Sequence, residues 1–342
     1  MRYLVTGGAG FIGANLVRHL LESRPDAEVV CLDLLTYAGN VESLAEVERE
    51  PRFHFIEGDI CDGATVRAAL VGADVVLHLA AESHVDRSIV ADAPFVRTNV
   101  VGTHTLLAAA LEARTARFVH VSTDEVYGTL PWRDPAVADP SAPRFTEDTP
   151  LDPRSPYAAT KAAADHLALA YHTTHGLDVV VTRASNNYGP YQFPEKLIPL
   201  MITHALEDRP LPLYGDGLHV RDWLHVGDHC RGLLAAAARG RPGRVYNFGG
   251  AAERTNLEVV RRILAAMDKH DARIEHVADR KGHDRRYAMD FGRAEAELGW
   301  TPAHSFDAGI EETVRWYLEH EPWWRRVVSG EYRHPISGEA SS

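Results

Sequence analysis

The first half of the chain alternates short apolar runs with longer segments of helical periodicity. Near-continuous apolar runs are typical of strands that are covered on both faces of a parallel sheet. We expect strands at Tyr3–Thr6, Val29–Asp33, Phe53–Glu57, Val75–Leu79, Phe118–Val121 and Val179–Thr182. The intervening periodicity predicts helices over Phe11–Leu21, Thr65–Leu70, Phe95–Ala113 and Tyr157–His175. This alternation predicts an α/β fold with a doubly wound parallel sheet.

From Asn186 onward the pattern changes, with more Pro, Gly, Tyr and charge and with shorter periodic segments. Helices are expected at Leu197–Leu206, Gly227–Ala238, Leu257–Met267 and Phe306–Glu319. We predict a first domain over 1–185 and a smaller mixed C-terminal lobe over 186–335, with segments near 222–248 returning to the first. The lobe should close a cleft over the carboxyl edge of the sheet. The proline-rich stretch 130–151 is expected to be a surface loop, and 336–342 a flexible tail.

Composition narrows the class of protein. The 342 residues are 45% apolar and 25% charged, with a net charge of −12, which argues against nucleic acid as a partner. Neither a signal peptide nor an apolar run of about 20 residues is present, so no membrane association is expected. Three cysteines without a CxxC motif fit buried thiols in a cytoplasmic protein. The 19 histidines are scattered, and His78, His84, His219 and His225 lack ligand-spaced partners, so no metal is expected.

A glycine-rich turn follows the first strand and opens the first helix. Gly7, Gly10 and Gly13 let the backbone approach a pyrophosphate, which the amides at the helix N-terminus then bind. Asp33 ends the second strand twenty residues after Gly13, where a carboxylate binds a ribose 2′-hydroxyl and repels a 2′-phosphate. The pattern therefore predicts a Rossmann-type domain that binds NAD rather than NADP. Asp59 and Ile60, after the third strand, either hold the adenine or simply cap a loop.

Tyr157 and Lys161 lie one helical turn apart, on one face of a predicted helix. A neighbouring ammonium and an oxidised nicotinamide would lower the pKa of the phenol from about 10 toward neutrality. The phenolate could then take a proton from a sugar hydroxyl while a hydride leaves its carbon, with Thr123 bonded to the same hydroxyl. We predict these three residues to be catalytic.

The adjacent acids Asp124 and Glu125 follow the strand that ends near Thr123. Alcohol oxidation does not require them, so they indicate further proton transfers. Two carboxyl groups divide acid and base roles when their environments separate their pKa values. After oxidation at C4, one could remove the C5 proton and the other protonate the departing C6 hydroxyl. Taken alone, the pair would equally fit solvated loop residues, and the residues do not order the two roles.

With these residues in place, the chain resembles the extended short-chain dehydrogenases/reductases and, among them, the dTDP-glucose 4,6-dehydratases. The resemblance runs from Met1 to about Pro335. It is carried by the segments 7–13, 33–40, 78–88, 122–128, 157–161, 186–199, 221–224 and 279–287. The Thr-Asp-Glu triplet at 123–125 and the Asn-Asn-Tyr-Gly-Pro segment at 186–190 are the most specific of these.

The resemblance implies roles by position. Tyr157, Lys161 and Thr123 would oxidise C4, Glu125 would remove the C5 proton and Asp124 would protonate the C6 hydroxyl, giving dTDP-4-keto-6-deoxy-glucose and water. It implies further NAD contacts at Phe11, Ile12, Thr36, Leu79, Ala80, Ala81 and Asn186. It implies contacts to dTDP-glucose at Glu82, Ser83, Asn187, Lys196, Leu197, Pro212, Tyr214, Arg221, Asn256, Arg280 and His283. Arg221 alternatively forms an ion pair with Asp222.

Two other functions remain open on the sequence. An NAD-dependent nucleotide-sugar 4-epimerase or a decarboxylase would share the cofactor site, but an epimerase does not need the Asp124–Glu125 pair. A non-enzymatic NAD sensor would not need Tyr157 and Lys161. The resemblance also implies a homodimer in which the helices 95–113 and 157–175 form a four-helix bundle. The preference for thymine or uracil, and the pathway that uses the product, are not predicted.

Overall fold

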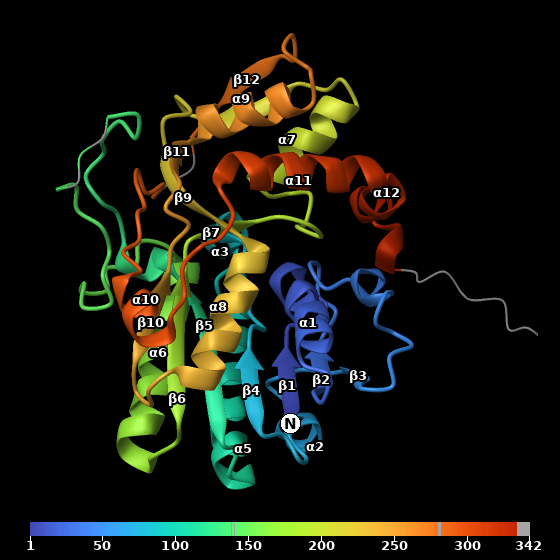
Figure 1. Cartoon of the computed structure of the whole chain (residues 1–342), viewed down its shortest axis with the longest axis vertical. Coiled ribbons are helices and arrows are strands. Elements are labelled where there is room, and N and C mark those ends of the chain that lie inside the picture. The colour runs from blue at the N-terminus through green and yellow to red at the C-terminus, as the bar shows by residue number, and fades with distance from the viewer. Residues whose placement is uncertain (138, 140, 280–281, 334–342) are drawn as a thin grey trace, which may run out of the picture.

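The computed structural model describes residues 1–137, 139, 141–279 and 282–333. Its centre is a seven-stranded parallel sheet with the strand order β10-β6-β5-β4-β1-β2-β3 (Figure 1). The strands are β1 (Arg2–Thr6), β2 (Glu28–Asp33), β3 (Phe53–Glu57), β4 (Val75–His78), β5 (Arg117–Thr123), β6 (Val179–Ala184) and β10 (Val245–Phe248). The six strands predicted from the apolar runs are confirmed.

Helices cover both faces of the sheet, which confirms the doubly wound fold. Helices α1 (Phe11–Ser23), α8 (Val226–Arg239) and α10 (Gly292–Leu298) bury apolar side chains against one face. The other face is covered by α2 (Gly63–Ala69), α5 (Thr103–Ala113) and α6 (Pro156–His175). Strand β1 is flanked by β2 on one side and by β4 on the other, so the strand order reverses between β1 and β4. Such a switch point leaves a crevice at the carboxyl ends of the strands.

Helix α6 is delimited by local sequence signals. The Ser155 side chain accepts the amide hydrogen of Ala158, Pro156 occupies the first turn, and Gly176 ends the helix with a φ of +71°. A short polar cap, an N-terminal proline and a left-handed glycine are each typical of their positions. This start places Tyr157 in the first turn and Lys161 one turn later.

The helix predicted over Phe95–Ala113 is present but not regular. It consists of α4 (Ala93–Phe95), a π-helical segment η2 (Val96–Gly102) and α5. A Cβ on Gly102 would come within 2.5 Å of Ile60, so this turn requires glycine. The wider turn directs Asn99 inward, where its amide nitrogen donates to Thr160 at 2.9 Å. Side-chain periodicity cannot separate such a segment from a regular helix.

A smaller mixed part lies beside the carboxyl edge of the large sheet (Figure 1). Its strands are β7 (Asn186–Tyr188), β9 (Val220–His225) and β11 (Glu253–Thr255) in the order β11-β9-β7, and the pair β8 (Leu211–Tyr214) and β12 (Ile274–Val277). Helices α7 (Leu197–Leu206), α9 (Asn256–Ala266), α11 (Phe306–Glu319) and α12 (Glu321–Ser329) form a second apolar core with them. The helices predicted at Leu197–Leu206, Leu257–Met267 and Phe306–Glu319 are confirmed, and the one predicted at Gly227–Ala238 is α8 on the large sheet. Helix α12 and the strands of this part were not predicted.

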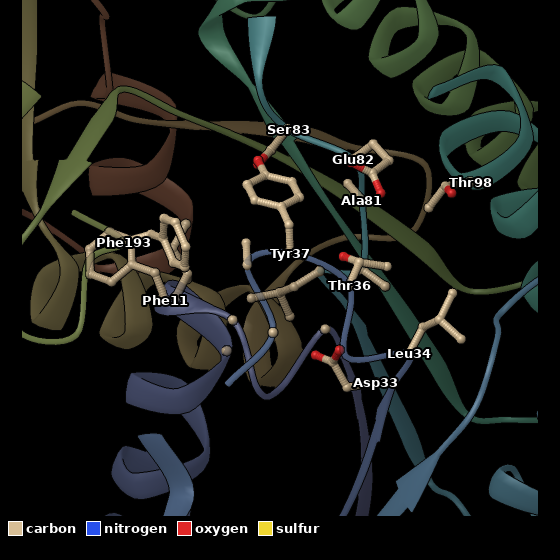
Figure 2. Close-up of a pocket in the computed structure, with 18 of the residues that line it drawn as sticks. Phe11, Asp33, Leu34, Thr36, Tyr37, Ala81, Glu82, Ser83, Thr98 and Phe193 are labelled. Atoms are coloured by element: carbon tan, nitrogen blue, oxygen red, sulfur yellow. The ribbon is translucent and has the colours of Figure 1, made fainter. Parts of the chain in front are cut away.

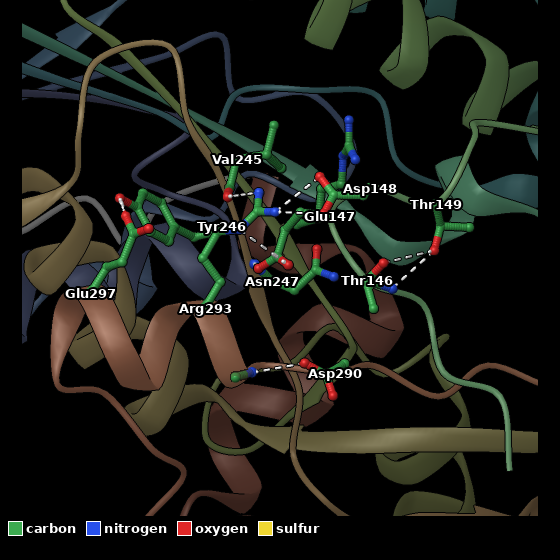
Figure 3. Close-up of polar contacts among 12 residues, drawn as sticks. Thr146, Glu147, Asp148, Thr149, Val245, Tyr246, Asn247, Asp290, Arg293 and Glu297 are labelled. Atoms are coloured by element: carbon green, nitrogen blue, oxygen red, sulfur yellow. Dashed lines mark hydrogen bonds and ion pairs between the residues drawn. The ribbon is translucent and has the colours of Figure 1, made fainter. Parts of the chain in front are cut away.

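Edge strand β10 is held by a polar network (Figure 3). Glu147 accepts the Asn247 amide hydrogen at 2.9 Å, and Arg293 of α10 pairs with Asp148 at 2.9 Å. These contacts cover an edge that would otherwise offer unpaired backbone groups. The described residues of the predicted loop 130–151 form no helix or strand, apart from one isolated bridge between Phe145 and Met289.

The proposed boundary between 185 and 186 stays a prediction, and the predicted tail 336–342 lies outside the described residues. In the described part of the chain, none of the helices is both long and apolar enough to cross a membrane.

Candidate active site

A deep pocket occupies the crevice at the switch point of the large sheet (Figure 2). Its wall is built from the segments that follow β1, β2, β3 and β4, with further residues from β5, α6 and the 192–196 segment. The predicted residues that line it are Gly7, Gly10, Phe11, Ile12, Gly13, Asp33, Thr36, Asp59, Ile60, Leu79, Ala80, Ala81, Glu82, Ser83, Tyr157, Lys161 and Lys196.

The glycine-rich turn can be filled only by glycine. Gly7 has a φ of +72°, and a Cβ there would lie 2.6 Å from the Ala80 nitrogen. A Cβ on Gly13 would lie 2.1 Å from the Gly7 oxygen. Gly10, the N-cap of α1, has no side chain to occupy the first amides of that helix. The cradle therefore fits the pyrophosphate of a dinucleotide.

Asp33 ties the turn to the end of β2. Its carboxylate accepts the amide hydrogens of Ala9 at 2.9 Å and Leu35 at 2.8 Å, and burial raises its pKa. Each oxygen keeps a second lone pair for a ribose hydroxyl. Asp59 lines the same pocket but also caps its loop, since it accepts the Cys61 amide hydrogen at 2.8 Å and pairs with Arg97 at 2.7 Å.

The five predicted catalytic residues meet where β5 ends beside α6. Thr123 is the last residue of β5 and caps the short 3₁₀ helix η3 (Asp124–Tyr127) by accepting the Glu125 amide hydrogen at 3.2 Å. Its hydroxyl lies 3.3 Å from Asp124 and is also hydrogen-bonded to Tyr157. Lys161 donates to the Val121 carbonyl at 2.8 Å, so its ammonium is fixed against β5.

Asp124 is 1% exposed, and its Oδ2 has no hydrogen-bond partner among the described residues. Burial, followed by the charge of Glu125, raises the pKa of Asp124 well above its usual value. This setting favours the protonated form of the carboxyl group. Solvated loop residues are therefore excluded as an interpretation of Asp124.

The prediction that the pKa of Tyr157 is lowered is wrong as far as the protein's own groups are concerned. Burial, and then the charges of Glu125 and Asp124, raise the pKa of Tyr157, and only the hydrogen bond with Thr123 opposes them. Burial also lowers the pKa of Lys161 to about 8. Burial is the largest of these effects, and the sequence pattern alone did not show that Tyr157 is buried close to the two acids.

The predicted substrate residues approach from the smaller part of the chain. Arg221 on β9 is buried, donates to the Asp284 carbonyl at 2.9 Å and lies over the Tyr287 ring, with its charge acting on Asp124. The Asp222 carboxylate instead accepts bonds from Ser185, Gly250 and Ala252, which argues against the Arg221–Asp222 ion pair. Successive residues of a strand point to opposite faces.

The remaining predicted contacts are distributed over several elements. Asn256 begins α9 and has a buried Oδ1 without a hydrogen-bond partner in the described chain. The Asn187 amide oxygen lies 3.0 Å from His229, and Lys196 is the N-cap of α7, which begins at Leu197. Asn186 is on β7, and Pro212 and Tyr214 are on β8. His283 contacts Asp279 at 2.6 Å. Arg280 lies outside the described residues.

Sequence reasoning missed several residues that line the pocket. Tyr37 projects into it and is hydrogen-bonded to Ser83 (Figure 2), while its ring lies 3.7 Å from the Arg87 guanidinium. Thr98, Gln192, Phe193 and Glu195 also line the pocket. Tyr37 lies in the segment 33–40, which carries part of the family resemblance. Its position four residues after Asp33 could therefore have predicted that it lines the pocket. The others come from irregular segments without a pattern.

A glycine cradle at the switch point, with a Tyr and a Lys one turn apart beside it, defines a short-chain dehydrogenase/reductase. Residues 4–313 match the family model of GDP-mannose 4,6 dehydratase. The chain is 52% identical over 329 residues to the dTDP-glucose 4,6-dehydratase of an Actinoplanes species, a match that covers 95% of this chain and all of that one. It therefore belongs to the family that this model describes and, within it, to the dTDP-glucose 4,6-dehydratases.

Solved structures agree. The dTDP-glucose 4,6-dehydratase of Streptomyces venezuelae, solved with NAD and TYD bound, is 51% identical with a TM-score of 0.90, covering 96% of this chain and all of that one. The UDP-glucose 4-epimerase of Thermus thermophilus, solved with NAD, has a TM-score of 0.84 but 30% identity, covering 94% and 100%. The fold is thus common to both activities, and the site must separate them.

Proposed function

We propose that this chain converts dTDP-glucose to dTDP-4-keto-6-deoxy-glucose and water, with NAD held in the pocket. The observation that carries this proposal is the buried Asp124 beside Glu125, adjoining Tyr157. A 4-epimerase needs only the Tyr157–Lys161 pair, and a sensor needs neither pair. The sequence identity to dTDP-glucose 4,6-dehydratases supports the same choice.

The pocket residues fit NAD. Gly7, Gly10 and Gly13 would hold the pyrophosphate, and Asp33 the adenosine ribose, with the remaining wall formed by Phe11, Ile12, Thr36, Asp59, Ile60, Leu79, Ala80 and Ala81. Asn186, also predicted to contact NAD, does not line this pocket. When bound, NAD supplies the acceptor for the C4 hydride and its return to C6, together with the positive charge that favours a Tyr157 phenolate.

Tyr157 is proposed to take the proton of the C4 hydroxyl, which Thr123 holds in place through its own hydroxyl. Lys161 stays largely protonated at neutral pH, because its pKa is about 8, and its charge favours the phenolate. Its bond to Val121 fixes the ammonium, so the charge is positioned before the substrate binds.

Glu125 and Asp124 are proposed to eliminate water from the 4-keto sugar. The ketone acidifies the C5 proton, which the Glu125 carboxylate removes as the bond from C6 to its hydroxyl breaks. Asp124, which holds a proton, gives it to the departing hydroxyl, so water leaves instead of hydroxide. The different environments of the two acids thereby support the order of roles that the sequence left open.

The rest of the substrate would lie between the two parts of the chain. We expect Glu82 and Ser83 to bind the glucose and Arg221 and Asn256 to bind the diphosphate and base, together with Arg280, which lies outside the described residues. Asn187, Lys196, Leu197, Pro212, Tyr214 and His283 complete the proposed nucleotide contacts. A substrate with about two negative charges needs cations, which a protein of net charge −12 must concentrate locally.

We further propose two domains, 1–185 and 186–335, a homodimer formed through α5 and α6, and a cytoplasmic location. Four exposed aliphatic residues, Ile89, Val90, Val96 and Val101, lie on α3 (Val85–Val90) and η2 beside these helices and support the dimer. Free Cys31, Cys61 and Cys230 fit a reducing compartment.

The test is turnover on a panel of nucleoside diphosphate sugars with NAD, followed by mass spectrometry. Loss of one water from dTDP-glucose, with less from UDP-glucose, is the expected result. Inversion at C4 without a change of mass would favour the epimerase, and loss of carbon dioxide from a uronate would favour the decarboxylase.

A further inference from the structure

Three side chains from separate elements converge beside the N-terminus of α8. His225 ends β9 and caps α8, His304 lies in the segment before α11, and Glu312 lies on α11. Their ligand atoms all lie within 4.8 Å of one another. Figure 1 shows α11 close to the end of α8. The prediction that His225 has no ligand-spaced partner concerns the sequence, in which residues 225, 304 and 312 have no recognisable spacing; the fold alone brings them together.

The gaps between these atoms are too wide for hydrogen bonds. Each histidine Nε2 lies 3.9 Å from an oxygen of Glu312, whereas a hydrogen bond of this type needs about 3 Å. His225 is 5% exposed, and its Nε2 has no hydrogen-bond partner among the described residues. A buried polar atom without a partner costs free energy unless a ligand satisfies it.

A second carboxylate orients His304. Its Nδ1 lies 2.9 Å from Asp228, which also accepts the His304 amide hydrogen at 2.9 Å. The Nδ1 has no hydrogen-bond partner among the described residues, because this short contact lacks hydrogen-bond geometry, and Asp228 also pairs with Arg231 at 2.6 Å. A ring proton on Nδ1 would still lie beside the Asp228 carboxylate and would leave the Nε2 lone pair facing Glu312. Histidine ligands of metals characteristically donate their other N–H to such a carboxylate.

His225 is also suited to ligation. Its ring is buried, and its Nε2, which has no hydrogen-bond partner among the described residues, lies 3.9 Å from the Glu312 carboxylate. The His225 Nδ1 accepts the Gly227 amide hydrogen in a long contact of 3.3 Å. This contact is lost when the ring proton moves to Nδ1, which leaves the Nε2 lone pair for a metal. The surroundings are acidic. Burial raises the pKa of the nearby Tyr188 most, and the charges of Asp228, Glu312 and Asp307 raise it further.

A second group, His219, Asp279 and His283, does not meet these conditions. The His283 Nδ1 is only 2.6 Å from Asp279 and is already bonded to it. After burial, the charge of Arg221 lowers the pKa of His219, and Arg285 acts in the same sense. Two guanidinium groups would repel a cation at that position.

We propose that His225, Glu312 and His304 bind a divalent transition-metal ion of the Zn²⁺ class, with water as the fourth ligand. Two imidazole nitrogens and one carboxylate oxygen form a ligand set that zinc accepts, at about 2.0–2.2 Å from each atom. None of the three residues lines the active-site pocket. The ion would cross-link the start of α8 to α11, and it would stabilise the folded chain because the unfolded chain offers no such site.

The test uses metal-free full-length protein and Zn²⁺, with Co²⁺ as a spectroscopic probe. Equilibrium dialysis of the unsubstituted protein should give about one bound Zn²⁺ per chain. His304→Ala and Glu312→Gln should each lower the affinity for Zn²⁺ at least tenfold. Co²⁺ should give the visible absorption of a site with nitrogen and oxygen ligands, and Zn²⁺ should raise the unfolding temperature of the unsubstituted protein only. His270→Ala is the control, since His270 is exposed and lies 3.5 Å from a single carboxylate, Asp268.

Turnover by the variants should stay unchanged, because these residues lie outside the proposed catalytic machinery. Equal Zn²⁺ affinity in the unsubstituted protein and both variants would overturn the proposal, as would failure of the unsubstituted protein to bind Zn²⁺ at micromolar concentrations.

Discussion

Two neighbouring acids at the end of β5 have different environments. Asp124 is 1% exposed, whereas the Glu125 side chain is only partly buried. Burial, reinforced by the charge of Glu125, keeps Asp124 protonated. The adjacent residues are thereby suited to different tasks, one as an acid and the other as a base.

Exchange at C5 should separate the two roles. In Asp124→Asn, Glu125 can still remove the C5 proton, so recovered dTDP-glucose should take up deuterium from heavy water while dehydration falls by about 10²–10⁴-fold. In Glu125→Gln, both exchange and dehydration should fall, although C4 oxidation still produces the absorbance of reduced NAD. Nuclear magnetic resonance of the recovered sugar measures the exchange. Rapid C5 exchange in Glu125→Gln would refute its assignment as the base.

The protonation of Asp124 also predicts a pH-dependent stability. The folded chain holds this proton well above the ordinary carboxyl pKa of 3.8, whereas the unfolded chain releases it near that value. The stabilising contribution is therefore complete below about pH 4 and is lost as the pH rises through the folded pKa.

Asp124→Asn removes this dependence. The free energy of unfolding of the variant, relative to that of the unsubstituted protein, should rise between pH 5 and pH 8. The rise should be about 1 kcal/mol for each pH unit that lies between the unfolded and the folded pKa of Asp124. Urea unfolding at the two pH values measures it. A difference that stays constant with pH would show that Asp124 is ionised in the folded protein.

The loop that follows β2 (residues 34–40, the cofactor loop) is held closed by contacts with the C-terminal part of the described chain. Residues 34 and 36–39 of this loop line the pocket, and the short 3₁₀ helix η1 (Val41–Leu44) follows soon after. Arg326 of α12 pairs with Glu42 at 2.7 Å, and the Tyr332 hydroxyl donates to the Tyr37 carbonyl. The C-terminal helix thus holds the loop against the pocket.

Arg326→Met should loosen this loop. Arg326 donates two hydrogen bonds to Glu42, so we expect NAD to dissociate severalfold faster without them, with the rate of C4 oxidation at saturating NAD nearly unchanged. Stopped-flow fluorescence of the bound dinucleotide measures the rate. Arg325→Met is the matched control, because Arg325 on the same helix pairs with Glu321 and Glu207 instead. Equal effects of the two substitutions would contradict the role of the loop.

Elements differed in how well the sequence predicted them. The strands of the large sheet were predictable because both of their faces are buried, which leaves uninterrupted apolar runs such as Val75–His78. Strands β8 and β12 were missed, since each is four residues long and only partly buried. The glycine turn and the Tyr157–Lys161 pair depend on local spacing and were found. The raised pKa of Tyr157 depends on acids more than thirty residues away in sequence, and no local pattern encodes that.

At the scale of the whole molecule, the active site lies between two cores. One part of the chain supplies the cradle, the Tyr157–Lys161 pair and the acids, and the other supplies the proposed substrate contacts Arg221 and Asn256. Each part has its own apolar core, so each can position its side chains independently. The substrate would bind where the two parts meet.

The proposed dimer places a helix face of one copy against its twin. Val101→Glu puts a charge at the 47%-exposed position on η2 and should convert the dimer to a monomer in sedimentation velocity at micromolar concentration. Val328→Glu, at a 52%-exposed position on α12, should leave it dimeric. A monomeric unsubstituted protein, or a dimer in both variants, would contradict this interface.

The most direct test of the whole account follows one hydrogen through the reaction. dTDP-glucose carrying deuterium at C4 should yield a product that has lost one water and carries the label at C6, with NAD unchanged at the end of each turnover. Appearance of the label in solvent, or its return to C4 in a product of unchanged mass, would contradict a 4,6-dehydratase.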